Sequence, residues 1–211
     1  MNHRDATAAD LPAIDRVFKR GFCDTFAHLY SDEDLNAFLG QFTPEAWREE
    51  FEDPRYRFRV AEADGQIVAF VKLGPATLPV ETDRNAIELR QLYALKEYHG
   101  TGISAALTDW ALEEARRHQV EELYLTVYTD NHRARRFYDR YGFEPVGRYD
   151  FMVGNHADED IVLRLDLWAS KPSARTCSPI SRTVSSVGAE AFPKAKCGAS
   201  TPATAVATIR R

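Results

Sequence analysis

Residues 96–107 read KEYHGTGISAAL, and this stretch holds the residue types in the chain best suited to binding an anion. Gly100 and Gly102 stand one residue apart, directly before a run with helical spacing. Glycine lets backbone N–H groups approach a ligand closely, and the first turn of a helix presents partial positive charge. The stretch therefore predicts a phosphate-binding loop with the reaction taking place beside it.

Two other interpretations of this loop are open. GTGISA satisfies the dinucleotide fingerprint G-x-G-x-x-G/A, but that fold places its first glycine at the strand end and repeats the β-α-β unit. Here residues 96–99 separate the glycines from the strand-like run, and only one β-α-β unit is visible. The glycines could also form nothing more than a turn into the helix. Phosphate binding fits the context best.

Hydrophobic periodicity indicates the elements that must position the loop. A strand is predicted at 86–95, a helix at 100–119, a strand at 122–129 and a helix at 131–142 that Gly142 closes. The buried stripe of the first of these helices should consist of Ile103, Leu107, Trp110, Ala111 and Ala115. These elements form one β-α-β unit and a further helix.

The flanking sequence predicts helices first and strands last. A helix at 7–29 should begin at a Thr7 cap, followed by helices at 32–42 and 43–52, the latter capped by Thr43. Strands at 56–63 and 66–74 should form a hairpin at Asp64-Gly65. Strands at 143–154 and 159–167 end the pattern. Residues 1–168 are thus expected to form one α+β domain with a mixed, mostly antiparallel sheet.

The sequence changes character after Trp168. Residues 169–211 are rich in Ala, Ser, Thr and Pro, and they contain a single aromatic residue. Such a segment buries too little apolar surface to offset its ordering entropy, so a disordered basic tail is predicted. A read-through extension and a tail that docks on a partner are the alternatives.

Composition excludes several classes of protein. The 211 residues carry a net charge of −5, but residues 1–168 alone carry −11, because the tail from Lys171 carries +6. An acidic body is not built for nucleic acid, and it weakly favours cationic small molecules. The three cysteines are far apart, which argues against a disulfide framework or a metal site. With no apolar run of membrane length and no apolar leader, we expect a cytoplasmic protein with no membrane association.

The run from 87 to 143 resembles the acyl-CoA-binding half of the GCN5-related N-acetyltransferases (GNAT). The extended loop of that family, Arg-Gly-x-Gly-x-Gly, falls on residues 99–104, with His99 in place of Arg and Ser104 in place of a glycine. A second mark falls on Asn131, Ala134 and FYDRYGF, in which Tyr138 takes the place of the family's tyrosine. The resemblance covers about residues 2–167. Weaker marks at both ends resemble the spermidine/spermine N-acetyltransferase branch.

The resemblance implies a GNAT fold, with a central β-α-β unit that binds acetyl-CoA as co-substrate. The strand 86–95 would splay from the strand 122–129, and the pantetheine arm would fit between them. The residues implied in binding are Leu92, Tyr93, Ala94, His99, Gly100, Thr101, Gly102, Ile103, Ser104, Asn131 and Tyr138. For Leu92 and Ala94, packing in a core strand is compatible with this role, because binding would use their backbone groups.

The resemblance also implies catalytic roles. Tyr138 would be the general acid that protonates the departing thiolate; the alternative is an aromatic residue that only packs against the sheet. Glu88 would be the base that takes the proton of the amine, directly or through water; the alternative is a surface carboxylate at a strand end. Tyr30 and Glu81 are further candidates on the acceptor side. His28 and His156 are expected to be surface histidines.

Three functions are consistent with the sequence. The first is an N-acetyltransferase for a small cationic amine resembling a polyamine. The second is an acetyltransferase of protein N-termini or lysines, and the third is a sensor that binds acyl-CoA without turnover. The expected partner is a small-molecule amine, and a homodimer is an alternative to a monomer that the sequence leaves open.

Overall fold

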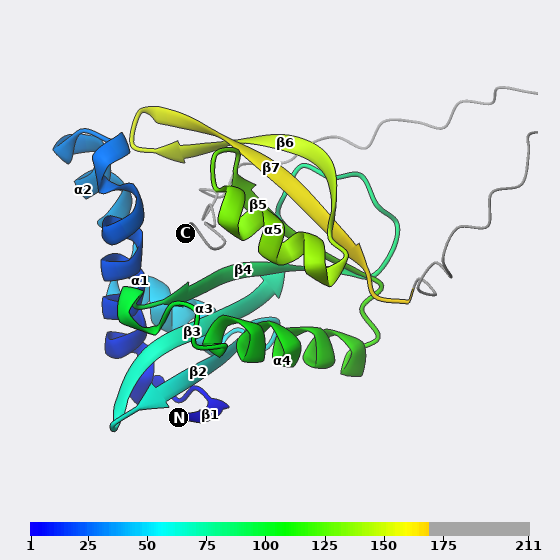
Figure 1. Cartoon of the computed structure of the whole chain (residues 1–211), viewed down its shortest axis with the longest axis horizontal. Coiled ribbons are helices and arrows are strands. Elements are labelled where there is room, and N and C mark those ends of the chain that lie inside the picture. Colours follow the sequence, from blue (N-terminus) through cyan, green and yellow to red (C-terminus); the bar gives the residue numbers. More distant parts are fainter. Residues whose placement is uncertain (169–211) are drawn as a thin grey trace, which may run out of the picture.

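The computed structural model describes residues 1–168, so the expectations for the tail lie outside the described residues. Seven strands form one sheet in the order β1-β2-β3-β4-β5-β7-β6 (Figure 1). The strands are β1 (Asn2–Asp5), β2 (Arg57–Ala63), β3 (Gln66–Pro75), β4 (Ala86–Ala94), β5 (Glu122–Tyr128), β6 (Glu144–Val153) and β7 (His156–Asp166). The helices are α1 (Leu11–Phe26), α2 (Asp32–Leu39), α3 (Pro44–Glu52), α4 (Ile103–Arg117) and α5 (His132–Tyr141).

The strand pairing is mixed, as predicted. Neighbouring strands are antiparallel throughout except β4 and β5, which are parallel because the crossover helix α4 joins them. The fold is therefore α+β with one central β-α-β unit. The edge strand β1 was not predicted, because its sequence NHRD is short and polar and forms a strand only by pairing with β2.

Local sequence signals account for most element boundaries. Asp64 and Gly65 both have positive φ, at 51° and 73°, which suits a tight turn between the antiparallel strands β2 and β3. The Thr43 hydroxyl accepts a hydrogen bond from the N–H of Ala46 and caps α3. Gly142 ends α5 with a φ of 88°, a conformation that favours glycine.

The start of the first helix differs from the expectation. Thr7 does cap a helical turn, but that turn is a 3-10 turn at Ala8–Asp10, and α1 begins only at Leu11. The Asp10 carboxylate accepts hydrogen bonds from the backbone N–H and the hydroxyl of Thr7, and it pairs with Arg4 of β1. The side chain of Asp10 thus anchors the helix entry to the edge strand.

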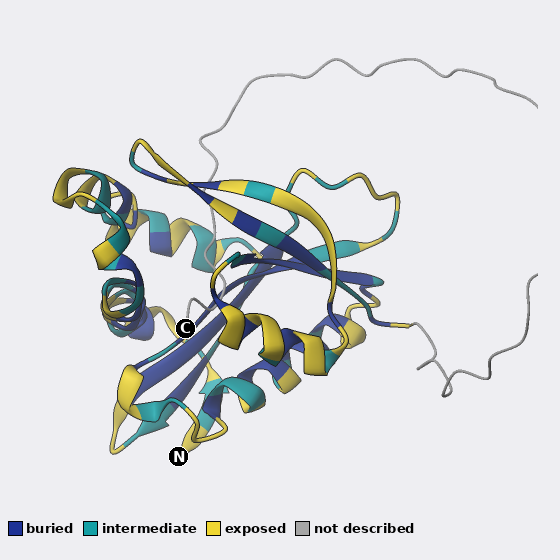
Figure 2. Cartoon of the chain, turned by 45° about the horizontal axis from the view of Figure 1, so that its top comes forward, coloured by how far each residue is buried: buried dark blue, intermediate teal, exposed yellow. Residues whose placement is uncertain are grey.

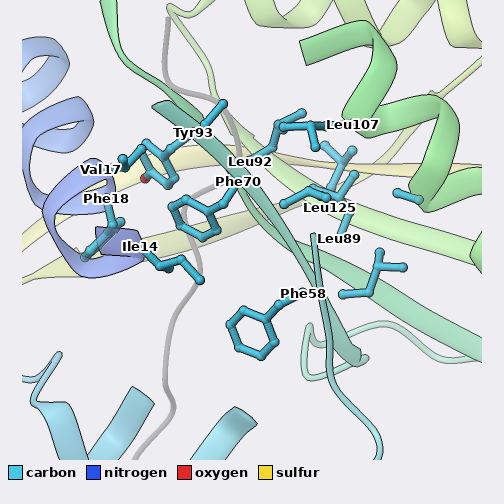
Figure 3. Close-up of a cluster of buried hydrophobic side chains, with 14 of the residues drawn as sticks. Ile14, Val17, Phe18, Phe58, Phe70, Leu89, Leu92, Tyr93, Leu107 and Leu125 are labelled. Atoms are coloured by element: carbon cyan, nitrogen blue, oxygen red, sulfur yellow. The ribbon is translucent and has the colours of Figure 1, made fainter. Parts of the chain in front are cut away.

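Helices cover both faces of the sheet. Alternate residues of a strand point to opposite faces, so adjacent Leu92 and Tyr93 of β4 contact different helices (Figure 3). Tyr93 packs on Phe18 of α1, with ring centroids 5.1 Å apart, and Leu92 lies beside Leu107 of α4. The predicted stripe of α4 is buried except for Trp110, which is half-buried under Arg59.

The β6–β7 hairpin extends beyond the body of the sheet, and α2 lies beside its tip (Figure 1). The backbone N–H of Asn155 in the hairpin turn donates to the Asp34 carboxylate of α2 at 2.7 Å. Most of β6 is exposed, in contrast to the buried central strands (Figure 2). This contact attaches the tip of the β6–β7 hairpin to α2.

Candidate active site

The parallel strands β4 and β5 separate soon after they begin. Only three residue pairs join them, from Ala86–Glu122 to Glu88–Tyr124, although β4 continues to Ala94 and β5 to Tyr128. Within the described residues, the backbone of β4 beyond Glu88 therefore faces β5 without ladder hydrogen bonds. An extended chain can pair with a strand edge of this kind. This is the opening that the resemblance to the GNAT family implied.

A β-bulge lies at the point of separation. The register between β3 and β4 shifts there: Lys72 pairs with Gln91 and Leu73 pairs with Leu89, which leaves Arg90 as the extra residue. A bulge re-aims the side chains and backbone groups around it and is common next to active sites. The bulge thus sets the direction of the backbone at Gln91 and Leu92.

A cavity of about 770 Å³ lies beside this opening. It extends from α1 across the end of β4 to the glycine loop and α5. Its volume is within the range of small-molecule and cofactor sites. Of the residues expected to bind the cofactor, seven line it: Leu92, Tyr93, Ala94, His99, Gly100, Gly102 and Ser104.

The glycine loop has the conformation that the sequence predicts. Gly100 and Gly102 have φ values of 78° and 89°, and Gly102 is the N-cap of α4. A Cβ atom added at either glycine would meet no heavy atom within 4 Å. Because both glycines line the cavity, this open space is part of it. The conformation requires glycine, and the cavity leaves room for a phosphate at the helix N-terminus.

Thr101 and Ile103 do not line the cavity with their side chains. The Thr101 hydroxyl donates to the carbonyl of Tyr98, and the Ile103 side chain is buried in the core. Any part that these residues take in binding would come from their backbone groups.

His99 has a role that the sequence did not indicate. Its Nε2 lies 3.0 Å from the Ala94 carbonyl oxygen, so Nε2 carries the hydrogen and donates. The imidazole ring therefore fixes the end of β4 to the glycine loop.

Positive charge gathers on the α5 side of the cavity. Arg133, Arg136 and Arg140 line it together with Lys96, against one carboxylate, that of Asp24. The three arginines are spaced i, i+3 and i+7, which places them on one face of α5. Sequence reasoning missed them, although this basic spacing in α5 was a usable signal. Guanidinium groups suit the phosphates of a nucleotide carrier.

The hydroxyl of Tyr138 is buried and has no hydrogen-bond partner among residues 1–168. The side chain is wholly buried, and burial, together with the nearby tyrosines Tyr93 and Tyr141, raises its pKa well above the ordinary value. The group therefore stays protonated near neutral pH and can donate a proton or a hydrogen bond. A buried polar group without a hydrogen-bond partner usually destabilises the fold by about 1–3 kcal/mol. A bound ligand that pairs with the Tyr138 hydroxyl would remove this cost.

Asn131 caps α5. Its side-chain oxygen accepts a hydrogen bond from the N–H of Ala134 at 3.0 Å, and Ala134 lines the cavity. The cap therefore positions the first turn of α5 at the cavity wall, while Asn131 itself is not among the lining residues.

The face of β4 that α1 and α3 cover carries several polar side chains. Glu88 is buried; its carboxylate accepts from the N–H and the hydroxyl of Thr77 and lies 3.5 Å from Arg90. It is not the surface carboxylate of the alternative interpretation. Tyr149 of β6 pairs in register with Asp160 of β7, and burial and the charges of Glu88 and Asp160 raise its pKa. We call the side chains of Glu88, Arg90, Gln91, Tyr149, Asp158 and Asp160 the polar face.

The remaining candidates lie at the rim of the polar face or away from it. The Tyr30 hydroxyl donates a hydrogen bond to Asp158, and Nε2 of His156 lies 3.2 Å from the same carboxylate. His28 is exposed, as expected, and it also lines the cavity from the α1 side. Glu81 is exposed in the loop between β3 and β4.

Comparison with known proteins agrees with this geometry. The sequence profile of the Acetyltransferase (GNAT) family matches residues 20–143. An uncharacterized N-acetyltransferase of Mycobacterium bovis is 34% identical over 140 residues, which cover 66% of this chain and 83% of that protein.

Two solved structures have the same fold. The ribosomal-protein-alanine N-acetyltransferase of Brucella melitensis is 26% identical with a TM-score of 0.61, and the match covers 79% of this chain and 99% of that chain. The PaiA N-acetyltransferase of Thermoplasma acidophilum, solved in complex with coenzyme A, is 20% identical with a TM-score of 0.61 and covers 78% and 98%.

Among the described residues, no helix is both long enough and apolar enough to cross a bilayer. The family profile spans the second half of α1, the splayed strands, the glycine loop and the helix that carries Tyr138. The chain belongs to the GNAT family and is an N-acetyltransferase that uses acetyl-CoA.

Proposed function

We propose that this enzyme acetylates a primary amine of a small cationic acceptor resembling a polyamine. The observation that supports this most directly is the polar face beside the opening between β4 and β5. Glu88, Asp158 and Asp160 bring three carboxylates to this face, and each is buried. Buried carboxylates beside a reaction centre favour a cationic ligand, because an approaching cation recovers the electrostatic energy that burial removes.

The proposed reaction is direct attack in a ternary complex. The nitrogen of a neutral amine forms a bond to the carbonyl carbon of the acetyl thioester, and the C–S bond then breaks. The amine nitrogen loses one proton and the leaving thiolate gains one, so the products are an N-acetyl amine and free coenzyme A. A hydrogen-bond donor at the carbonyl oxygen stabilises the negative charge of the tetrahedral intermediate.

In this proposal, the backbone of Leu92, Tyr93 and Ala94 pairs with the pantetheine arm, and the N–H of Leu92 polarises the thioester carbonyl. The loop from His99 to Ser104 and the arginines of α5 hold the phosphates. Tyr138 gives its proton to the thiolate, and Glu88 receives the proton of the amine through water. The hydrogen bonds from Thr77 and the nearby Arg90 hold the Glu88 carboxylate in place at the point where β4 and β5 separate.

Steady-state release of free thiol from acetyl-CoA tests the acceptor class. Spermidine and spermine should be acetylated with a higher kcat/KM than a peptide with an N-terminal alanine. The advantage should shrink as salt rises from about 10 mM to 150 mM, because the Debye length falls from about 30 Å to 8 Å. A peptide turned over far better than either polyamine would refute the proposed acceptor and leave the family assignment intact.

A second candidate function is acetylation of protein N-termini. It rests on the 26% identity and the TM-score of 0.61 to the ribosomal-protein-alanine N-acetyltransferase of Brucella melitensis. The same assay decides between the two, because the peptide is one of its substrates.

A further inference from the structure

Gln91 is a residue of the polar face that takes no part in the reaction proposed above. Its side chain is buried, and neither Nε2 nor Oε1 has a hydrogen-bond partner within the described part of the chain. A buried amide with both ends unpaired is rare in a folded protein, and a bound ligand is one of the few explanations. The two atoms offer one acceptor and two donor hydrogens.

The bulge in β4 determines where Gln91 points. Gln91 pairs in register with Lys72, and residues opposite each other on neighbouring strands share a face. The Lys72 side chain reaches Glu50 of α3, so Gln91 also lies on the face covered by α1 and α3, the polar face. Arg90, the extra residue of the bulge, lies on the same face, against Tyr56 of the α3–β2 connection. The bulge therefore makes the consecutive side chains of Arg90 and Gln91 point the same way.

Gln91 is also next to the site of transfer. Leu92, the following residue, lines the cavity, and the β4–β5 ladder has already ended at Glu88. Consecutive Cα atoms are about 3.8 Å apart, so a group attached at Gln91 is within side-chain reach of a thioester held at Leu92. The amide is thus on the acceptor's side of the strand against which the acetyl donor would lie.

We propose that the Gln91 amide binds the attacking nitrogen of the acceptor and holds it as the free amine. This proposal rests on the proposed function for the position of acetyl-CoA, but it does not depend on which amine is the acceptor. Oε1 accepts one N–H of the amine, which turns the nitrogen lone pair toward the carbonyl carbon. After the attack, the other N–H loses its proton toward water and Glu88, and the thiolate leaves as in the reaction above.

A neutral amide suits this task better than a carboxylate. A carboxylate would favour the ammonium form, which has no lone pair for attack, whereas an amide binds an amine without adding negative charge. The charged groups around Gln91 are paired: Lys72 of β3 with Glu50 of α3, and Arg90 with Glu88 of β4 itself. Asp158, Asp160 and Tyr149 are the other ionisable groups of the polar face, on the two strands beyond β5. The polar face would therefore attract a cation at its far side and hold a neutral nitrogen at Gln91.

The first test is Gln91→Leu, which removes both polar atoms and keeps a similar volume. The expected result is a loss of at least tenfold in kcat/KM for spermidine and for the alanine peptide, with the Kd for acetyl-CoA within twofold of the parent. The melting temperature should be equal or higher, because the unpaired amide is gone. The exposed Gln66 of β3 supplies the control, and Gln66→Leu should change none of these values.

The second test is Gln91→Glu, which serves even if the leucine variant folds poorly. A carboxylate at this place should favour the ammonium form, so the acidic limb of the profile of kcat/KM against pH should move up by about one unit. The proposal is overturned if folded variants keep the parent's acceptor kinetics and pH profile. Because both amines are tested, a wrong acceptor class changes the ranking of the substrates and not the effect of Gln91.

Discussion

At the scale of single residues, Gly102 combines a constrained backbone with a place in the cavity wall. Its φ of 89° strains any other residue, and a side chain there would occupy the space expected for the pyrophosphate. Gly102→Val should raise the Kd for acetyl-CoA at least tenfold, about 1.4 kcal/mol, measured by calorimetry.

Gly65 offers a matched control for this variant. It also has positive φ and open space at its Cβ position, but it lies in the β2–β3 turn, far along the chain from the glycine loop. Gly65→Val should cost similar backbone strain and leave the Kd unchanged. Equal affinities in folded Gly102→Val and parent proteins would count against phosphate binding by the loop.

Tyr138 is the second residue whose role can be isolated. Tyr138→Phe keeps the packed ring and removes only the unpaired hydroxyl, so the loss should fall on the chemical step. General acids contribute roughly 100-fold or more, and water could supply part of this. Single-turnover transfer at saturating acetyl-CoA should slow by about tenfold to 100-fold, while the melting temperature holds or rises.

Tyr141→Phe is the control on the same helix, because the Tyr141 hydroxyl bonds to Asp109 of α4 at 3.0 Å and is half-buried. This change should leave the single-turnover rate alone and lower stability slightly. A Tyr138→Phe rate within about twofold of the parent would remove Tyr138 from the proton transfer.

At the scale of elements, α3 is held to the sheet through a buried ion pair. Lys72 of β3 is fully buried, donates to Glu50 of α3 at 2.5 Å and lies 4.9 Å from the Trp47 ring. Burial outweighs the attraction of Glu50 and lowers the pKa of Lys72 to about 8. In the unfolded chain the ordinary pKa is about 10.4. Between these two values the unfolded state binds more protons, so Lys72 makes stability rise with pH in that window.

This linkage can be measured against Lys72→Met, which has no titrating group. The free energy of unfolding of the parent minus that of the variant should increase by roughly 2 kcal/mol between pH 8 and pH 10. Taking the difference cancels the titration of the tyrosines, which both proteins share. A flat difference across this range would mean that Lys72 keeps an ordinary pKa in the fold.

The helices and strands also show which parts of the fold could be predicted from the sequence. Strands, helices and caps with local signals were predicted to within a few residues, including the hairpin at Asp64-Gly65 and the end of α5 at Gly142. β1 was missed because its only cause is pairing with β2, which lies more than 50 residues later.

Site residues divide in the same way. The glycine loop could be predicted from its own spacing, whereas the buried pairs of the polar face depend on strand register. The bulge at Arg90 and the orphan amide of Gln91 arise from the pairing of β3 with β4, which no local pattern specifies.

At the scale of the whole molecule, residues 1–168 contain one continuous core from α1 to β7. We therefore expect removal of residues 170–211 to leave the melting temperature and the Kd for acetyl-CoA unchanged, because the core needs no further segment. Differential scanning calorimetry of the shortened and full-length chains checks this. A loss of several degrees would place part of the tail in the folded domain.

The short ladder between β4 and β5 has a further consequence for the sheet as a whole. Strands β1 to β4 form one half of the sheet and strands β5 to β7 the other, and three residue pairs between β4 and β5 connect the two halves. A substrate arm that pairs with β4 would act as a temporary eighth strand. The amide hydrogens of β4 near Leu92 that point toward β5, and not those bonded to β3, should then exchange slowly only in the loaded enzyme. Unfolding of the two halves should also become more cooperative. Release of coenzyme A would require breaking the hydrogen bonds of this added strand, so we expect product dissociation to be slow.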